Sequence, residues 1–277
     1  MTVPHVHLNN GVEIPQLGFG VFQIDPADTA AAVSQAIGVG YRHIDTAEMY
    51  GNEKEVGEGI RASGVDVADI WITSKINNNR HGYDSTLAAF DQTLTDLGVE
   101  QIDLILIHWP LPEAGDFVGT WKALEKVYAE GRARSIGVSN FQSNHLNRLA
   151  DECTVVPAVN QIEVHPYLTQ DALRAFNAEH GIATEAWSPI AQGGVLNDPV
   201  IKGIAAEHGK STAQVVLRWH VQLDNIIFPK SSSAERMREN FEIFDFELSP
   251  ADMGFISALN RDERTGPDPD VFNYVPA

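Results

Sequence analysis

Short apolar runs alternate with longer stretches of helical periodicity along most of the chain. Eight of these runs have the length and the content of aliphatic and aromatic residues that are typical of strands. They are residues 16–20, 41–44, 70–75, 102–108, 134–139, 158–162, 183–187 and 225–230. Between the runs, apolar residues recur at helical spacing, as Leu87, Phe90, Leu94 and Leu97 do. This alternation predicts an α/β protein of eight strand–helix units, with an open doubly wound sheet as the alternative to a closed (β/α)8 TIM barrel.

The two ends of the chain add further elements. Residues 6–8 and 12–14 flank an Asn-Gly pair, a strong turn signal, so we expect an N-terminal β-hairpin. Two helical patterns, residues 200–208 and 212–222, precede the last strand, and extra C-terminal helices are expected at residues 234–240 and after Ser249-Pro250. The tail from residue 264 is rich in Pro and Asp and is expected to be irregular. No linker rich in Pro, Gly or Ser interrupts the pattern, which predicts one barrel domain over residues 1–277.

Charge and cysteine content narrow the possible functions. The formal net charge is −19, and the sequence pI is about 4.8. An acidic surface repels nucleic-acid phosphates and anionic lipids, so neither is expected as a partner. Cys153 is the only cysteine, which excludes an intramolecular disulfide. The N-terminus lacks the apolar region of a signal peptide, and no apolar run is long enough to span a membrane, so we expect a cytoplasmic protein.

Polar and aromatic residues follow the predicted strands at their carboxyl ends. In a closed barrel these ends meet at one mouth, where TIM-barrel enzymes place their chemistry. The strand-end residues are Asp45, Lys75, His108, Ser139, Asn140, Gln161, Trp187, Ser188 and Lys230, and Tyr50 lies one short loop beyond Asp45. Any one of them alone is more often structural, but their convergence favours a functional site.

Four of these side chains have complementary chemistry. Tyr50 keeps its proton at neutral pH and can donate it when a nearby ammonium, Lys75, stabilises the phenolate. Asp45 can hold Lys75 in its charged form, and His108 can hydrogen-bond a substrate oxygen. A proton donor without an activated nucleophile suits reduction of a carbonyl better than hydrolysis.

The same residues lie in segments that resemble the aldo-keto reductase superfamily. The similar segments are GYRHIDTAEMYGNE, TSKI, DLILIHWP, RSIGVSNF, PAVNQIEVHP and PKSSSAERMREN, in that order along most of the chain. Within the superfamily the chain looks similar to bacterial 2,5-diketo-D-gluconate reductases. The resemblance implies an NADPH-dependent carbonyl reductase, monomeric, in which Tyr50 is the acid, Lys75 and Asp45 tune it, and His108 orients the substrate.

The resemblance also assigns residues to the cofactor. It implies that Ser139, Asn140 and Gln161 hydrogen-bond the nicotinamide carboxamide and that Trp187 stacks on the nicotinamide ring. The residues implied to cover the pyrophosphate are Ser188, Pro189, Ile190, Gln192 and Gly193. Those implied to hold the 2′-phosphate are Lys230, Ser231 and Arg236, and those implied to contact adenine are Glu239 and Asn240. Cations clustered with serines at a helix start fit a phosphate, which favours NADPH over NADH.

Two positions depart from the family pattern. Asn77 lies where the family often has tryptophan, so we expect a more polar substrate pocket on that side. Ser233 lies where some relatives have a second arginine, which predicts weaker phosphate binding. The other pocket candidates are Phe22, Met49, Trp109, Phe272 and Tyr274. The substrate class stays open among diketo sugars, dicarbonyls and small aldehydes or ketones.

Two other functions are compatible with the same residues. One is a Schiff-base aldolase with Lys75 as nucleophile, although an Asp45 partner would keep the amine protonated. The other is an NADPH-binding sensor or auxiliary protein that turns over slowly. The GFGVFQ segment lacks the third glycine of a dinucleotide-binding fingerprint, and no motif with metal-ligand spacing is present, so no metal is expected.

Overall fold

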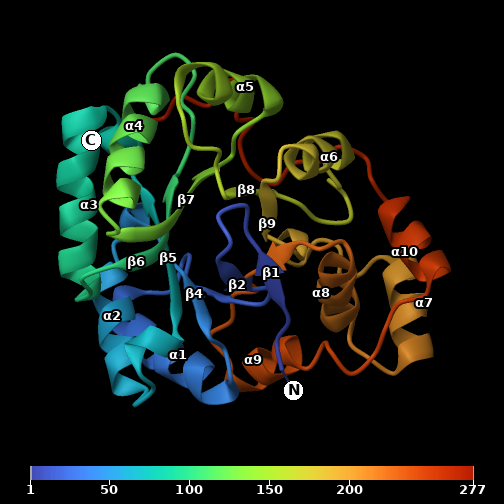
Figure 1. Ribbon diagram of the computed structural model, residues 1–277. Helices are drawn as coiled ribbons and strands as arrows, with labels where there is room; N and C mark the ends of the chain where they lie inside the picture. The colour runs from blue at the N-terminus through green and yellow to red at the C-terminus, as the bar shows by residue number, and fades with distance from the viewer. Residues whose placement is uncertain (1, 277) are drawn as a thin grey trace.

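Eight parallel strands form a barrel surrounded by helices in the computed structural model, which describes residues 2–276 (Figure 1). The strands are β3 (Phe19–Gly20), β4 (His43–Asp45), β5 (Trp71–Ile76), β6 (Ile102–Ile107), β7 (Ala133–Ser139), β8 (Val159–Glu163), β9 (Ala183–Trp187) and β10 (Ile226–Ile227). They pair in chain order from β3 to β10. A parallel bridge between Leu17 and Ile227 joins the two edges, and the Gly18 N–H donates to the Ile227 carbonyl at 2.8 Å. The predicted (β/α)8 barrel is confirmed.

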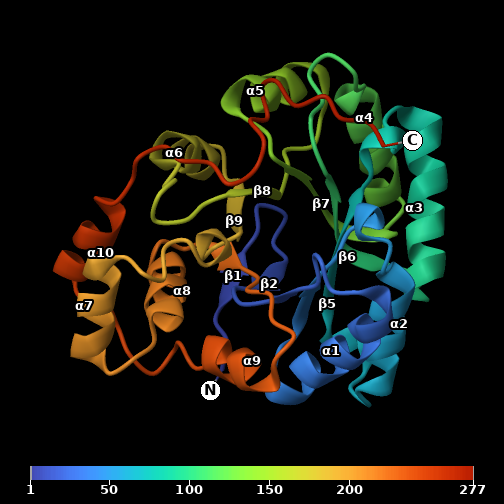
Figure 2. The ribbon, with the colours of Figure 1, turned by 180° about the vertical axis from the view of Figure 1, so that it is seen from behind.

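Helices connect the strands and cover the outside of the barrel. They are α1 (Pro26–Val39), α2 (Glu53–Ala62), α3 (Tyr83–Leu97), α4 (Phe117–Ala129), α5 (Ser143–Glu152), α6 (Asp171–Glu179), α7 (Pro199–His208), α8 (Thr212–Gln222), α9 (Ala234–Phe241) and α10 (Pro250–Ser257). As expected, two helices lie between β9 and β10 and two follow β10. The additional helices α7 and α10 pack against each other on one side of the barrel (Figure 2).

The strands have apolar side chains on both faces. Ile72 of β5 and Ile105 of β6 belong to the cluster that packs with the helices, including Phe90 of α3. Their chain neighbours Trp71 and Leu104 belong to a second cluster with the N-terminal hairpin. Because successive strand residues point to opposite faces, every second residue after Trp71 and Leu104 also points into the barrel interior. Asp45 and Lys75 therefore point into the interior, at the end of the barrel where the strands have their carboxyl ends.

The N-terminal hairpin closes the end of the barrel at which the strands begin. It consists of β1 (His5–His7) and β2 (Glu13–Pro15), paired antiparallel, which confirms the predicted hairpin to within a residue at each end. Asn9 Nδ2 donates to the Pro157 carbonyl at 2.9 Å, and Asn10 Nδ2 donates to the Arg134 carbonyl at 3.0 Å. These bonds tie the hairpin to β7 and to the segment that precedes β8.

The first and last barrel strands are shorter than predicted. Residues 16–20 were expected to form one strand, but the ladder is regular only over Phe19–Gly20, with an isolated bridge at Leu17. Residues 225–230 give only Ile226–Ile227. Pro229 has no N–H to donate to a ladder, which prevents continuation of the last strand.

The C-terminal tail runs across the loops at the carboxyl ends of the strands (Figures 1 and 2). Residues 264–276 contain no helix or strand, in agreement with the expectation for the tail. Asn273 Oδ1 accepts from the Glu113 and Ala114 N–H groups at 2.8 and 3.1 Å, and the Tyr274 carbonyl accepts from Asn78 Nδ2 at 2.9 Å. The tail is therefore fastened to the loops that follow β5 and β6.

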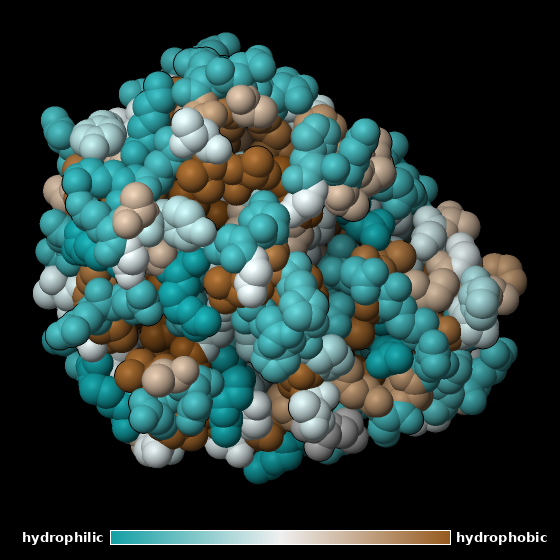
Figure 3. Space-filling model, viewed as in Figure 1, coloured by the Kyte–Doolittle hydropathy of each residue, from teal (hydrophilic) through white to brown (hydrophobic). Residues whose placement is uncertain are grey.

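The face of the molecule seen in Figure 3 is mostly polar. Hydrophilic residues cover most of the face in Figure 3, and its largest hydrophobic patch lies in a recess in the upper half. None of the helices described in residues 2–276 has both the length and the hydropathy that crossing a bilayer requires.

Candidate active site

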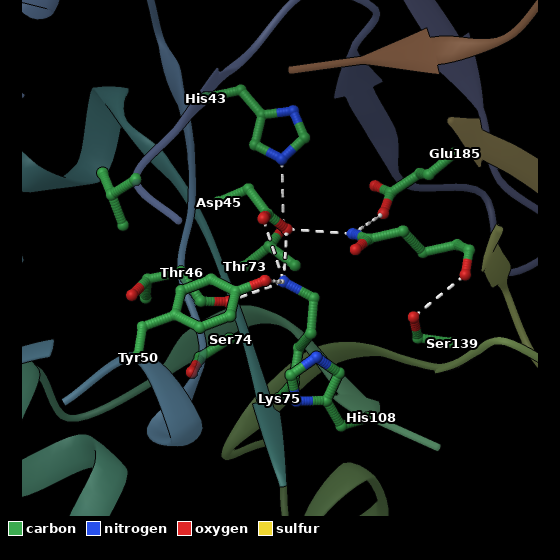
Figure 4. Close-up of polar contacts among 12 residues, drawn as sticks. His43, Asp45, Thr46, Tyr50, Thr73, Ser74, Lys75, His108, Ser139 and Glu185 are labelled. Carbon is green, nitrogen blue, oxygen red and sulfur yellow. Dashed lines mark hydrogen bonds and ion pairs between the residues drawn. The ribbon is translucent and has the colours of Figure 1, made fainter. Parts of the chain in front are cut away.

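Six consecutive strands, β4 to β9, bring a polar or aromatic side chain to the same end of the barrel. These residues are Asp45, Lys75, His108, Ser139, Gln161 and Trp187. Figure 4 shows four of these side chains, Asp45, Lys75, His108 and Ser139. Parallel pairing aligns them, since Asp45 is in register with Thr73, and Ser139 is in register with Gln161. These six strand-end residues are thus neighbours in space.

A buried ion pair lies at the centre of this group. Lys75 Nζ donates to both carboxylate oxygens of Asp45 at 2.9 Å and to the Thr46 carbonyl at 2.8 Å. The Lys75 side chain is 0% exposed and that of Asp45 is 6% exposed. Burial of either charge alone would cost free energy because the charge loses its hydration. The opposite charge beside it offsets this cost, so each residue stabilises the charged form of the other.

Tyr50 reaches the ion pair from the loop after β4. It ends a short 3₁₀ helix, η1 (Glu48–Tyr50), which stops at Gly51 in the left-handed conformation, with φ of 65°. Lys75 Nζ also lies 3.4 Å from Tyr50 Oη, a longer contact than its three bonds to Asp45 and Thr46. Phe22 packs on the Tyr50 ring with centroids 4.9 Å apart. The structure therefore places the phenol, the ammonium and the carboxylate in one contact network.

The protonation states follow from burial and from these neighbours. Burial raises the pKa of Tyr50 and the charge of Asp45 adds to this, while Lys75 acts in the opposite direction. The expected lowering by Lys75 is present but does not dominate, so Tyr50 retains its proton. Burial alone would lower the pKa of Lys75, but Asp45 and Tyr50 outweigh it and the pKa is raised. A protonated Lys75 argues against a Schiff-base nucleophile.

His108 lies beside Tyr50 as a neutral imidazole. Their ring centroids are 5.8 Å apart in an edge-to-face arrangement. Burial, and secondly the charge of Lys75, hold the pKa of His108 well below its usual value. Its Nδ1 is buried and has no hydrogen-bond partner within residues 2–276. A neutral His108 can donate one hydrogen bond to a ligand.

Asn140 connects His108 to Trp187. Its Nδ2 donates to the His108 carbonyl at 3.0 Å and to Ser139 Oγ at 3.1 Å, and its Oδ1 accepts from Trp187 Nε1 at 2.8 Å. Asn140 adopts a positive φ of 65°, a conformation that asparagine tolerates better than most residues. These bonds fix the indole ring at the barrel mouth.

Gln161 joins the ion pair to a second buried carboxyl. Its Nε2 donates to Asp45 Oδ2 and to Glu185 Oε2, both at 2.9 Å. Glu185 is 0% exposed, and its Oε1 has no partner within residues 2–276. Burial first and the Asp45 charge second raise the pKa of Glu185 to about 8. Glu185 is therefore an uncharged acid at neutral pH.

The sequence analysis does not identify Glu185, nor Glu163 at the end of β8. Glu185 lies two residues before Trp187, and Glu163 lies two residues after Gln161. The period of two along a strand is the signal that could have found both, because it puts them on the same face as a selected residue.

The loop after β9 is held in tight turns. Ser188 and Gln192 have positive φ angles of 49° and 52°, and Gly193 has 93°. The Ile190 carbonyl accepts from the Gly193 N–H at 2.8 Å, and the buried ring of His220 bonds the Pro189 carbonyl at 3.0 Å. The five residues selected for the pyrophosphate thus form one ordered turn beside Trp187.

A second set of selected residues lies after β10, around the start of α9. Lys230 and Arg236 are exposed, and neither makes an ion pair with any described residue. Ser231 is buried, and its Oγ accepts from the Ser233 N–H at 3.0 Å. Glu239 and Asn240 lie in the last turn of α9. Within residues 2–276, no hydrogen bond or ion pair joins this cluster to Tyr50 or Lys75, so the structure does not bring all selected residues into one network.

The selected pocket residues differ in their surroundings. Phe22 is 52% exposed beside Tyr50, and Met49 is half-buried in η1. Trp109 is buried under Phe272 of the tail, with ring centroids 4.4 Å apart. Asn77 Oδ1 accepts from the Asn78 N–H at 2.7 Å and is used in a local turn, so a more polar substrate pocket on this side stays a prediction. The tail thus forms part of the rim of the mouth.

A metal site and a second ligand site at the far end of the barrel have less support in the structure. Within residues 2–276, no group of three or more His, Cys, Asp or Glu side chains could hold a metal ion. A cavity of about 560 Å³ lies beside the hairpin at the opposite end of the barrel. Among its charged lining residues, Arg134 and Asp103 pair with each other at 2.6 Å.

Comparison with known proteins agrees with the architecture. The model of the aldo/keto reductase family matches residues 16–261. An aldo-keto reductase of Mycolicibacterium smegmatis is 54% identical over 98% of this chain and 99% of the relative. A glyoxal reductase of Bacillus subtilis is 50% identical over 96% of each chain. The crystal structure of a Gox0644 variant in complex with NADPH matches with a TM-score of 0.96 and 44% identity, over 99% of this chain and 100% of that one.

These matches extend over nearly the whole chain and go together with the same barrel. The resemblance inferred from the motifs is thus confirmed at the level of the family, while the finer likeness to 2,5-diketo-D-gluconate reductases stays a prediction. The chain belongs to the aldo/keto reductase family and is an oxidoreductase.

Proposed function

We propose that this protein uses NADPH to reduce the carbonyl group of a small aldehyde or ketone, with Tyr50 as the proton donor. The observation that carries the proposal is the contact of Lys75 Nζ with Tyr50 Oη at 3.4 Å while the same ammonium is held by Asp45. A phenol beside a fixed cation at the mouth of a barrel can give up a proton to a polar substrate oxygen.

The donor and acceptor atoms around Trp187 fit a nicotinamide carboxamide. Both Nε2 hydrogens of Gln161 and both Nδ2 hydrogens of Asn140 are engaged within the protein. Ser139 Oγ donates to the Gln161 carbonyl at 2.9 Å. These three residues therefore retain acceptor capacity, and each could accept a hydrogen bond from the carboxamide NH₂. The half-buried Trp187 ring supplies an aromatic surface beside them.

The cluster after β10 fits the other end of the cofactor. Lys230 and Arg236 are exposed, and neither has a carboxylate partner among the described residues. A dianionic 2′-phosphate would supply the missing negative charge, and Ser231 lies between them in the sequence. NADH lacks this phosphate, so the cluster favours NADPH. When bound, NADPH supplies the hydride for the reduction.

The protein's own residues manage the proton and the orientation. Tyr50 holds a proton on Oη, and His108 directs the substrate oxygen toward it by a hydrogen bond. As the proton leaves Tyr50, Lys75 stabilises the phenolate, and Asp45 keeps Lys75 charged. Gln161 holds Asp45 in the orientation that Lys75 requires.

The pocket is suited to small substrates with a second polar group. Phe22 and Trp109 give it aromatic walls, and Asn77 leaves one side polar. The 50% identity to a glyoxal reductase supports a dicarbonyl compound, such as a short dicarbonyl or a diketo sugar. We further propose that residues 1–277 act as one domain, in a monomer in the cytoplasm.

Replacement of Tyr50 by phenylalanine tests the assignment. Tyr50→Phe should lower kcat by a factor of at least about 100, the usual contribution of a positioned acid, and change the Kd for NADPH by less than about threefold. Tyr83→Phe, at an exposed position on α3, is the matched control and should have no effect. If Tyr50→Phe retains most of its turnover with a dicarbonyl substrate, the assignment of Tyr50 as the acid is contradicted. If the wild type does not bind NADPH, the assignment of the cofactor is contradicted.

A further inference from the structure

The C-terminal tail contacts the indole of Trp187 through a glycine. A Cβ atom placed on Gly266 would lie 2.4 Å from Trp187 Cη2 and 3.3 Å from both Cζ2 and Cζ3. Real side chains do not tolerate a contact of 2.4 Å, so only glycine allows the backbone to approach the ring so closely. The six-membered end of the indole is therefore bounded by main chain that is 79 residues further along the sequence.

Glu163 holds this part of the tail in place. Its Oε1 accepts from the Thr265 N–H at 2.6 Å and from Thr265 Oγ1 at 2.5 Å, and its Oε2 accepts from the Gly266 N–H at 3.2 Å. His165 Nε2 bonds to Oε1 at 3.0 Å. Burial alone would raise the pKa of Glu163, but these bonds outweigh burial and lower it. A buried carboxylate with four donors is a strong and directional anchor.

The two contacts are joined through the barrel itself. Glu163 ends β8 and Trp187 ends β9, and the two residues are direct partners in the parallel register. The carboxylate and the indole therefore start from neighbouring points on rigid strands. The ring is held at one end by the bond from Nε1 to Asn140 and is limited at the other end by Gly266.

We propose that Glu163 and Gly266 are positioning residues for the cofactor, which act by fixing the plane of the Trp187 indole. Glu163 determines where the Thr265–Gly266 segment lies, and the missing side chain of Gly266 determines how far the ring extends toward the tail. This inference rests on the proposed function, because it assumes that Trp187 contacts the nicotinamide.

Substitution of Gly266 by alanine gives the sharpest test. The methyl group must displace the ring, because the strands fix the backbone of Trp187. The expected result is a roughly tenfold weaker Kd for NADPH, close to the upper end of what one aromatic contact contributes. The Kd is measured by titration of NADPH fluorescence and so does not depend on turnover. Gly254→Ala on α10, where a Cβ meets nothing within 4 Å, is the control and should leave the Kd unchanged.

A double-mutant cycle distinguishes positioning from general damage to the tail. In a Trp187→Ala background the methyl of Gly266→Ala has no ring to displace, so it should change the Kd by less than twofold. Glu163→Gln replaces one acceptor oxygen with an NH₂ group, which cannot accept a hydrogen bond from the Thr265 and Gly266 donors. It should therefore release the Thr265–Gly266 segment. It should weaken NADPH binding in the wild type, speed amide exchange at residues 265 and 266, and have little further effect without Trp187.

The outcomes separate this inference from the proposal it rests on. Equal losses from Gly266→Ala with and without Trp187 would overturn the positioning role, as would an unchanged Kd in Gly266→Ala. If Glu163→Gln does not fold, Gly266→Ala and its cycle still decide the question, because that change leaves the anchor intact. A wild-type protein that does not bind NADPH would instead refute the proposed function.

Discussion

Glu185 offers a direct test of the electrostatics inside the barrel. Its carboxyl is fully buried, and the cation within reach, Lys75, is already bonded to both oxygens of Asp45. The pKa of Glu185 is raised from 4.5 to about 8, by burial first and then by the charge of Asp45. Glutamine has almost the same shape and cannot ionise, so Glu185→Gln removes this one titration and keeps a hydrogen-bonding partner for Gln161.

The sign of the effect on stability follows from the direction of the shift. The folded state holds the proton of Glu185 more tightly than the unfolded state does. The stabilisation is therefore complete below pH 4.5 and is lost as the pH rises toward about 8. At about 1.4 kcal/mol per pKa unit the full loss is about 5 kcal/mol, an upper limit because local relaxation and water entry reduce it. Glu185→Gln should lack this loss.

Urea denaturation at a series of pH values measures the effect. The free energy of unfolding of the wild type minus that of Glu185→Gln should fall steadily between pH 5 and pH 8. Glu53→Gln is a matched control: Glu53 is also buried, with a pKa raised to about 7 by burial, so its own difference should level off about one pH unit earlier. A difference for Glu185→Gln that is flat over this range, or that rises with pH, would refute the reasoning.

Three further changes probe other parts of the molecule. Lys75→Met leaves Asp45 buried without its cation and should cost about 3–5 kcal/mol of unfolding free energy along with turnover, as thermal denaturation and a carbonyl-reduction assay would show. Arg236→Ala should weaken NADPH roughly tenfold and NADH less than twofold, whereas Arg238→Ala should affect neither; equal losses for both cofactors would contradict the phosphate assignment. Gly57→Ala should cost about 2 kcal/mol, because its Cβ would lie 2.1 Å from the backbone oxygen that ends α3; a stabilised variant would contradict that packing.

Local patterns predict the elements that carry the site better than the contacts between them. Asp45, Lys75 and His108 could be selected because apolar strands end at them and parallel strand ends converge. Glu185 lies on the same inward face but was hidden in a short segment read only for Trp187. The prediction thus found most of the polar residues at the strand ends, but it missed Glu163, which ends β8, and Glu185, which lies two residues before the end of β9.

Contacts between distant segments could not be derived from the sequence. Glu163 and Thr265 are 102 residues apart, and nothing in either segment indicates the other. The competition between burial and Lys75 at Tyr50 also depends on atomic distances. The assignment of Lys230 and Arg236 to a phosphate came from family resemblance, since exposed cations look alike in any sequence.

The closure of the barrel has a consequence for how the protein is made. The Leu17–Ile227 bridge joins segments from near the beginning and near the end of the chain. During synthesis the sheet can grow strand by strand, but its first strand has no partner on its outer side until the last one leaves the ribosome. Over that interval an open, hydrophobic sheet edge is exposed to other chains. Since β3 and β10 are only two residues long each, that edge is short, which limits the opportunity for misassembly before the ring is complete.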